Sequence, residues 1–195
     1  MHSVRYTTVL QAHQAREICL ATLLMSASTA NCLALLSIAT SSGNAELAKQ
    51  SLDICLADPQ AAVQADPKAF SNLSLDAVLH LLGHDALSAR EDEVLLMLVR
   101  WVDADAKARS PMLSVAARRC VRTSLLSYEQ LVALDEHPDV CKNYEAISLV
   151  ASLFISLIME GPSNGAALDR PRLCSMPDAG RTGSSSTGTL MPLVC

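Results

Sequence analysis

Aromatic side chains are scarce in this chain of 195 residues: one Trp, three Tyr and two Phe make up 3% of it. No polar–apolar alternation or hairpin turn signal stands out either, which argues against an aromatic-rich β sandwich. Half of the residues are hydrophobic, and Ala, Leu, Val and Ile dominate that half. Such side chains favour helices packed on helices, so we predict an all-α fold.

Signatures of catalysis and cofactor binding are also missing. The sequence has no GxGxxG, no phosphate-binding GxxxxGK loop and no HExxH. His80 and His84 share a helical spacing, but Gly83 interrupts that helix and no third metal ligand is evident. We therefore predict that the protein is not an enzyme and has no cofactor, no metal and no small-molecule substrate.

Positive charge is in short supply, because 20 acidic residues outweigh 15 basic ones and the net charge is −5. The one basic cluster is Arg118, Arg119 and Arg122, and no aromatic residues interleave with it. We interpret it as a solvated helix end and predict no nucleic-acid partner. The carboxylates of Glu91 and Asp92 likewise lack a nearby nucleophile and are interpreted as a solvated face.

No apolar run is long enough to cross a membrane. The longest spans residues 146–159, about 14 residues against the roughly 20 that a membrane helix needs. The start of the chain, MHSVRYTTVLQAHQ, lacks the apolar core of a signal peptide. We therefore expect a buried helix at residues 146–159 and no membrane partner.

The seven cysteines are odd in number and form no CxxC pair. Five of them lie in apolar, helix-like runs, which predicts buried, reduced thiols in a protein of the cytoplasm or nucleus. These five are Cys19, Cys32, Cys55, Cys120 and Cys141.

Helical periodicity begins at Glu17, and from there capping residues divide the sequence into many helices. Thr29 is the predicted cap of the second helix, and Asp58-Pro59, Asp66-Pro67 and Ser74 begin later ones. Further helices are expected over residues 45–56 and, as the last long one, 139–159.

Two capping boxes give the clearest starts: Ser88 with Glu91, and Ser127 with Gln130. The first box should open a helix that runs to about Lys107 and carries Trp101 on its buried face.

Composition divides the chain into three parts. Residues 1–16 show no strong pattern and form a poorly defined N-terminus, whereas residues 17–159 form one helical domain. Residues 160–195 are rich in glycine, proline and serine and are expected to be a disordered tail.

The order of these elements resembles the BACK domain, the helical module that follows the BTB domain and often precedes Kelch repeats. The resemblance covers roughly residues 17–157, and the BTB domain and the Kelch repeats have no counterpart. The residues that carry it are Asn31-Cys32-Leu33, Ala39, Phe70, Leu73, Leu75, Leu79, Leu82, the segment DALSAREDEVLLMLVRWVDAD at 85–105, Arg109, Leu113, Val121-Arg122, Leu125-Leu126 and Leu131.

The resemblance implies a multi-helix array of antiparallel helix pairs and a non-catalytic role in protein interaction. Family members act as substrate adaptors of cullin-RING ubiquitin ligases, and residues 17–39 resemble the 3-box helix pair near the cullin. A cullin is thus an implied partner, with a candidate groove at Leu20, Leu24, Leu33 and Leu36. The alternative is a helical spacer or regulatory binding module without a ubiquitin role, in which these leucines pack against each other.

Overall fold

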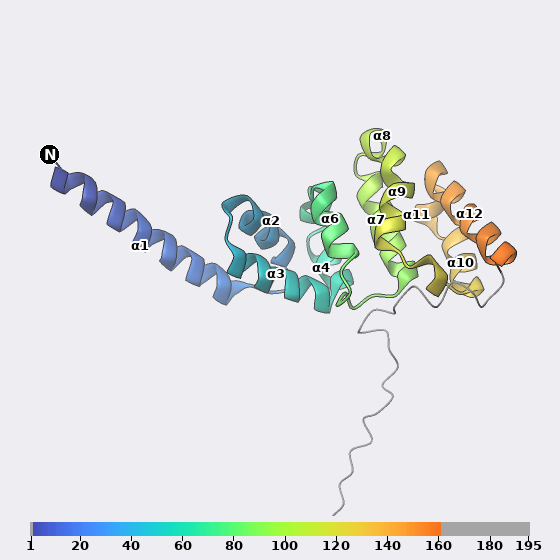
Figure 1. Cartoon of the computed structure of the whole chain (residues 1–195), viewed down its shortest axis with the longest axis horizontal. Helices are drawn as coiled ribbons and strands as arrows, with labels where there is room; N and C mark the ends of the chain where they lie inside the picture. The colour runs from blue at the N-terminus through green and yellow to red at the C-terminus, as the bar shows by residue number, and fades with distance from the viewer. Residues whose placement is uncertain (1, 161–195) are drawn as a thin grey trace, which may run out of the picture.

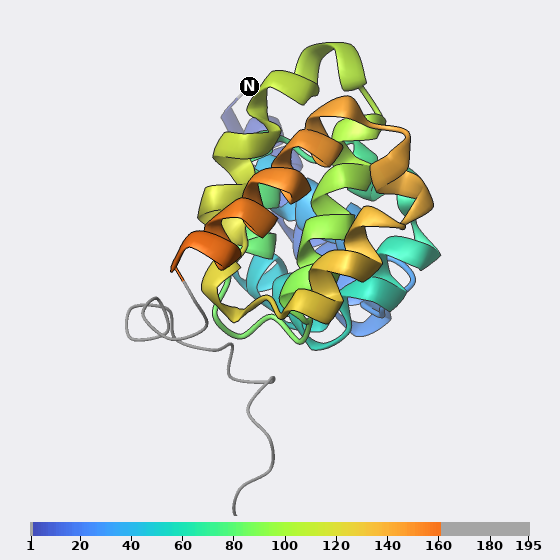
Figure 2. The same ribbon diagram turned by 90° about the vertical axis from the view of Figure 1, so that its right-hand side faces the viewer.

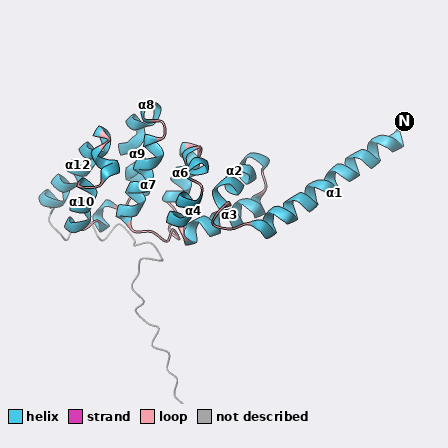
Figure 3. Ribbon diagram, turned by 180° about the vertical axis from the view of Figure 1, so that it is seen from behind, coloured by secondary structure: helices cyan, strands magenta, loops and turns pink. Residues whose placement is uncertain are grey.

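The computed structural model describes residues 2–160, and every regular element in that range is helical (Figure 3). The all-α prediction is confirmed, whereas the predicted disorder of the tail concerns residues that, from 161 on, lie outside the described part. The helices are α1 (His2–Ser26), α2 (Cys32–Ser42), α3 (Ala45–Ala57), α4 (Pro59–Ala65), α5 (Pro67–Ser71), α6 (Leu75–Leu82), α7 (Glu91–Asp103), α8 (Ala106–Arg109), α9 (Leu113–Cys120), α10 (Tyr128–Asp135), α11 (Pro138–Cys141) and α12 (Tyr144–Glu160), with 3-10 turns at Ser110–Met112 and Thr123–Leu125.

The helices form an elongated array of antiparallel pairs (Figure 1). Helix α2 packs extensively on α3, α7 packs on α9, and α10 packs on α12. Helix α1 projects from the α2–α3 end, and Figure 2 looks at the opposite end, where α12 lies in front. Within residues 2–160, no helix combines the length and the hydropathy needed to span a membrane.

Helix α7 is the centre of the hydrophobic core. Its N-terminal carboxylates, Glu91 and Asp92, are buried along with its apolar residues, so solvent reaches little of the helix. It contacts α5, α6, α9, α10 and α11. The apolar residues that it buries are Val94, Leu95, Met97, Leu98, Val99, Trp101 and Val102.

Trp101 is a core residue, as predicted, with 2% of its surface exposed. Its indole N–H donates to the carbonyl of Leu73 at 2.9 Å. The Arg109 guanidinium lies 4.2 Å from the centre of the ring and donates to the carbonyls of Ser71, at 2.9 Å, and of Trp101, at 2.7 Å. The pair therefore joins the end of α7 to α8 and to the turn after α5.

Most of the predicted helix starts are confirmed. The carboxylates of Asp58 and Asp66 accept backbone N–H bonds at 3.0 and 2.9 Å, each ahead of a proline in the first helical position. Ser74 caps α6 with a bond of 3.3 Å. Ser127 and Gln130 bond reciprocally at the start of α10, at 2.8 and 3.3 Å, as a capping box requires.

The predicted capping box at Ser88 and Glu91 is wrong, because α7 begins later. The backbone N–H of Ser88 donates to Leu56 at 2.8 Å, and Arg90 is the N-cap residue. The reciprocal carboxylate is that of Glu93, which accepts the Arg90 N–H at 2.9 Å.

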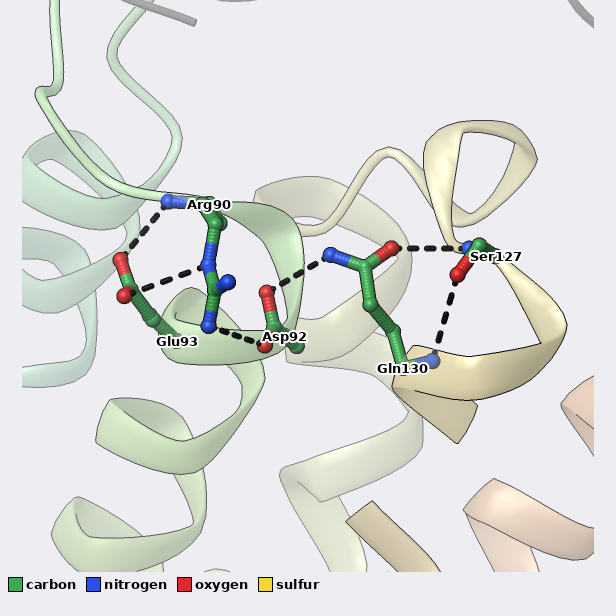
Figure 4. Close-up of polar contacts among 5 residues, drawn as sticks. All are labelled: Arg90, Asp92, Glu93, Ser127 and Gln130. Carbon is green, nitrogen blue, oxygen red and sulfur yellow. Dashed lines mark hydrogen bonds and ion pairs between the residues drawn. The ribbon is translucent and has the colours of Figure 1, made fainter. Parts of the chain in front are cut away.

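The solvated face predicted for Glu91 and Asp92 is also wrong, since only 6% and 8% of these residues is exposed. Glu91 accepts bonds from the backbone N–H and the guanidinium of Arg122, at 2.9 and 3.4 Å, so Arg122 belongs to this pair rather than to a solvated cluster. Asp92 lies between Arg90 and Gln130 and accepts a 2.9 Å bond from each (Figure 4). Each buried carboxylate is thus paired, as burial of charge requires.

Four further element boundaries differ from prediction. Helix α1 begins at His2, well before Glu17, where helical periodicity was predicted to begin. Asn31, rather than Thr29, precedes α2. Helix α7 ends at Asp103, short of Lys107, and the last predicted helix is divided at Asn143 into α11 and α12. Asn143 caps α12 by accepting the Ala146 N–H at 3.1 Å.

The Arg109 interactions predict a specific loss of stability. Replacing Arg109 by Ala removes a cation over the Trp101 ring and a charged donor to two carbonyls, so the unfolding free energy should fall by about 1.5–3 kcal/mol. Urea denaturation followed by circular dichroism measures this loss. Lys107→Ala, an exposed change in the same short helix, is the control and should stay within about 0.5 kcal/mol of wild type. Equal effects of the two changes would contradict the role given to Arg109.

The contacts of Gln130 predict a similar loss at the other end of α7. Gln130→Ala breaks the capping box of α10 and removes a donor from the buried Asp92 carboxylate, which should cost about 1–3 kcal/mol in thermal or urea unfolding. Gln64→Ala, an exposed change in α4, is the matched control and should be nearly neutral. A neutral Gln130→Ala would mean that Asp92 needs no second partner.

Candidate partner-binding site

The joint between α1 and α2 is held by one amide side chain. Asn31 Oδ1 accepts the backbone N–H of Ser28 at 2.8 Å, and its Nδ2 donates to the carbonyl of Ser26 at 3.0 Å. The side chain therefore bridges the last residue of α1 and the turn after it. This double contact fixes the direction in which α1 leaves the array (Figure 1).

The second half of α1 lies against the start of α3. Gln50 Nε2 donates to the carbonyl of Leu24 at 3.1 Å, which ties α3 to α1. Gly43 ends α2 with a φ of 68°, a left-handed conformation that favours glycine. Asn44 then caps α3 by accepting the Leu47 N–H at 2.9 Å. The sharp turn at residues 43 and 44 thus places the first turn of α3 beside α1.

A pocket of about 520 Å³ lies where these segments meet. Leu20, Ala21 and Leu24 of α1 supply its apolar side. The α2–α3 turn and the first turn of α3 form the opposite side, from Gly43 to Glu46, and Arg16 and Glu17 also line it. An apolar wall beside charged side chains suits a partner with an apolar anchor and a polar rim.

The structure separates the four leucines of the candidate groove. Leu20 and Leu24 are partly exposed and line the pocket together. Leu33 and Leu36 are buried, with 1% and 8% of each exposed, because α2 packs on α3. The pocket therefore forms between α1 and α3 rather than between the two helices of residues 17–39. Residues 43–46, which also line the pocket, were not among the predicted groove residues, although the Gly43-Asn44 pair is a turn signal in the sequence.

Two cysteines pack in the α2–α3 interface, at the start of α2 and near the end of α3, away from the residues that line the pocket. Cys32 and Cys55 are fully buried, and Cys32 Sγ lies 3.4 Å from the carbonyl of Thr29. A hydrogen bond between the two thiols lowers the pKa of Cys32 and raises that of Cys55, which burial raises further. Because no solvent reaches either sulfur, the pair serves packing rather than reaction.

The remaining candidates give no reactive centre in the part of the chain that the structure describes. The rings of His80 and His84 lie 5.9 Å apart, but no group of three or more potential metal ligands occurs among these residues. Arg118 and Arg119 are exposed, as predicted for the basic cluster. The letters GPSNG at 161–165 match the GxSxG pattern of hydrolases, but they come after a helix, whereas that motif needs a strand before it.

The prediction that the first five cysteines are buried is correct for three of them and wrong for two. Cys32, Cys55 and Cys120 are buried, whereas Cys19 on α1 and Cys141 at the end of α11 are exposed. The reason is that α1 contacts the array mainly through α3, and α11 is a short surface helix.

This difference in exposure predicts which thiols react first. Iodoacetamide should modify Cys19 and Cys141 in the native protein and spare Cys32, Cys55 and Cys120, since alkylation needs an accessible thiolate. Peptide mass spectrometry after a timed reaction measures this, and denaturation before alkylation is the control. Modification of Cys32 or Cys55 at the rate of Cys19 would contradict the buried interface.

Comparison with known proteins identifies one family. Residues 32–135 match the family model described as BACK, BTB And C-terminal Kelch, which covers more than half of the chain. The matched range begins at α2 and ends with α10, so it contains α7 and the Trp101–Arg109 pair. No curated protein sequence matches the chain.

Proposed function

Since the chain belongs to the BACK family, BTB And C-terminal Kelch, we propose that it is a scaffold for a cullin-RING ubiquitin ligase and that its α1–α3 end contacts the cullin. The family is a non-catalytic, protein-interaction type of module, and substrate adaptors of these ligases contain it. We propose that the protein is located in the cytoplasm or nucleus, where such ligases assemble.

The observation that carries this proposal is the pocket between α1 and α3. Leu20 and Leu24 lie one helical turn apart on α1 and remain partly exposed beside a pocket of about 520 Å³. Apolar side chains spaced by one turn next to a groove are a common means of gripping a partner segment. The residues lie within 17–39, the stretch that resembles the 3-box helix pair.

The rest of the array supports a spacing role. The buried α7 and its paired ends join the α2–α3 end to the α10–α12 end through a continuous core. A partner held at one end of such an array would stay at a set distance from anything held at the other (Figure 1). A scaffold of this kind supplies position and leaves the chemistry to its partners.

Titration of a cullin N-terminal domain into the full chain, followed by calorimetry, tests the proposal. With one small pocket as the contact, we expect a Kd of about 0.1–1 mM, or roughly −4 to −5.5 kcal/mol. Leu24→Asp places a charge in the pocket and should weaken binding about tenfold or more.

Ile18→Asp is the matched control, because Ile18 is 67% exposed on the same helix and does not line the pocket. It should bind as wild type does, and circular dichroism checks that both variants fold. If wild type and Leu24→Asp bind equally, or if neither binds at millimolar concentration, the cullin contact is refuted. The protein would then be a spacer or regulatory module without a ubiquitin role.

A further inference from the structure

A second hollow, of about 420 Å³, lies between α9 and α12 at the end of the array opposite to α1. Leu95, Val121, Leu149 and Leu153 supply its apolar surface. The two leucines of α12 are only partly buried, so they offer apolar surface to an occupant. We call this hollow the α9–α12 groove.

The α12 side of the groove is lined by small residues. Ser148, Ser152 and Ser156 recur every fourth position and line the groove together with Leu149 and Leu153. The hydroxyls of Ser152 and Ser156 donate to carbonyls of their own helix, at 2.7 and 3.1 Å. Because these two hydroxyls donate within α12, Ser152 and Ser156 leave room above the leucines without presenting donors that need an outside partner.

The charges on the groove balance, since Arg118 and Glu145 both line it. An uncharged apolar segment therefore suits it better than an acidic or basic one. The groove runs along α12 from Glu145 to Ser156, one turn before the helix ends at Glu160. The chain continues from that end of the groove.

The chain itself contains a segment of matching chemistry. Residues 190–194 read LMPLV, with no charge and four apolar side chains besides the proline, and they come after the polar stretch GRTGSSSTGT at 180–189. Pro192 disfavours a helix and suits an extended segment. Five extended residues span about 16 Å, which fits within the roughly 25 Å length of the 17-residue α12.

The chain between α12 and residues 190–194 is long enough for this segment to reach the α9–α12 groove. Residues 161–189 separate the end of α12 from this segment, and a random coil of 29 residues has a root-mean-square end-to-end distance of about 30 Å. That span covers the whole of α12. A tether of this kind gives an effective concentration of about a millimolar, so even a contact with a millimolar Kd is populated about half of the time.

We propose that residues 190–194 dock into the α9–α12 groove of their own chain and cover Leu149 and Leu153. The tail then acts as an internal ligand that any outside partner of this groove must displace. This contact does not depend on the cullin contact at α1, because the two sites lie at opposite ends of the array (Figure 1).

Backbone amide NMR spectra of the full chain test the proposal through a change in the tail. Leu193→Asp adds a charge to the docking segment and should reduce the docked fraction from about half to below about a tenth. The amide resonances of residues 148–156 and 114–121 should move as a result. Thr187→Asp, which adds the same charge upstream of the segment, is the control and should leave these resonances in place.

The reciprocal change is in the groove. Ser152→Lys should move the amide resonances of residues 190–194, whereas Ser37→Lys, an exposed change in α2, should not. Circular dichroism checks that the Ser152→Lys and Ser37→Lys variants fold. The Leu193→Asp experiment does not depend on this check, because Leu193 lies outside α1–α12.

Three outcomes are distinct. Reciprocal shifts that do not change over about a tenfold range of protein concentration support docking within one chain. Shifts that grow with concentration would assign the groove to a second copy and overturn the proposal. Unmoved groove resonances in Leu193→Asp would overturn it as well.

Discussion

The structure depends above all on the burial of α7. In the middle of a buried helix the backbone groups bond to one another, so apolar side chains can be buried there without leaving a polar group unpaired. At the ends of the helix, backbone groups lack partners within the helix. In α7 both ends are also where charged side chains enter the core. At the first end these are Glu91 and Asp92, and at the last end Arg109 approaches Trp101. The fold requires a partner for each of these groups, because burying an unpaired charge destabilises the fold by far more than burying one leucine side chain stabilises it.

The partners come from segments that are distant in the chain, and this is what makes the array continuous. Arg122 reaches Glu91 from the stretch after α9, and Gln130 reaches Asp92 from α10 (Figure 4). Trp101 and Arg109 bind the carbonyls of Leu73 and Ser71, next to α5. Satisfying the two ends of one helix thus joins the helices on both sides of it. A chain of short helices, each marginal alone, becomes one cooperative body.

The same contacts decide which surfaces stay open for protein interaction, the role that the BACK family indicates. The buried carboxylates of Glu91 and Asp92 are occupied in holding helices together, and the cysteines at the α2–α3 interface are sealed from solvent. Apolar surface stays open at both ends of the array, including Leu20 and Leu24 beside α3 and Leu149 and Leu153 between α9 and α12. The end of α12 is also open, because Ile155, Ile158 and Met159 are exposed, so the helix expected to be buried at residues 146–159 is buried only in part. Apolar surface next to small or charged side chains suits contact with other chains, and the core sets the distance between the two ends.

The sequence by itself determined the local features: an all-α fold, the starts of α4, α5, α6 and α10, and the burial of Trp101. These features arise from bonds that close within four residues and from a 3.6-residue period, both of which are visible in a short window. The tertiary structure decided the rest. Ser88 looked like a cap but donates its N–H to Leu56, and α7 begins instead after Arg90. Arg122 and Gln130, which complete the pairing of Glu91 and Asp92, lie more than thirty residues away, so no local pattern predicts that these carboxylates are buried. The leucines of residues 17–39 are alike in the sequence, but their exposure differs. The packing of α2 on α3 buries Leu33, whereas the position of α1 leaves Leu24 partly exposed. Exposure is a property of what packs against a side chain, and that is settled only when distant segments meet.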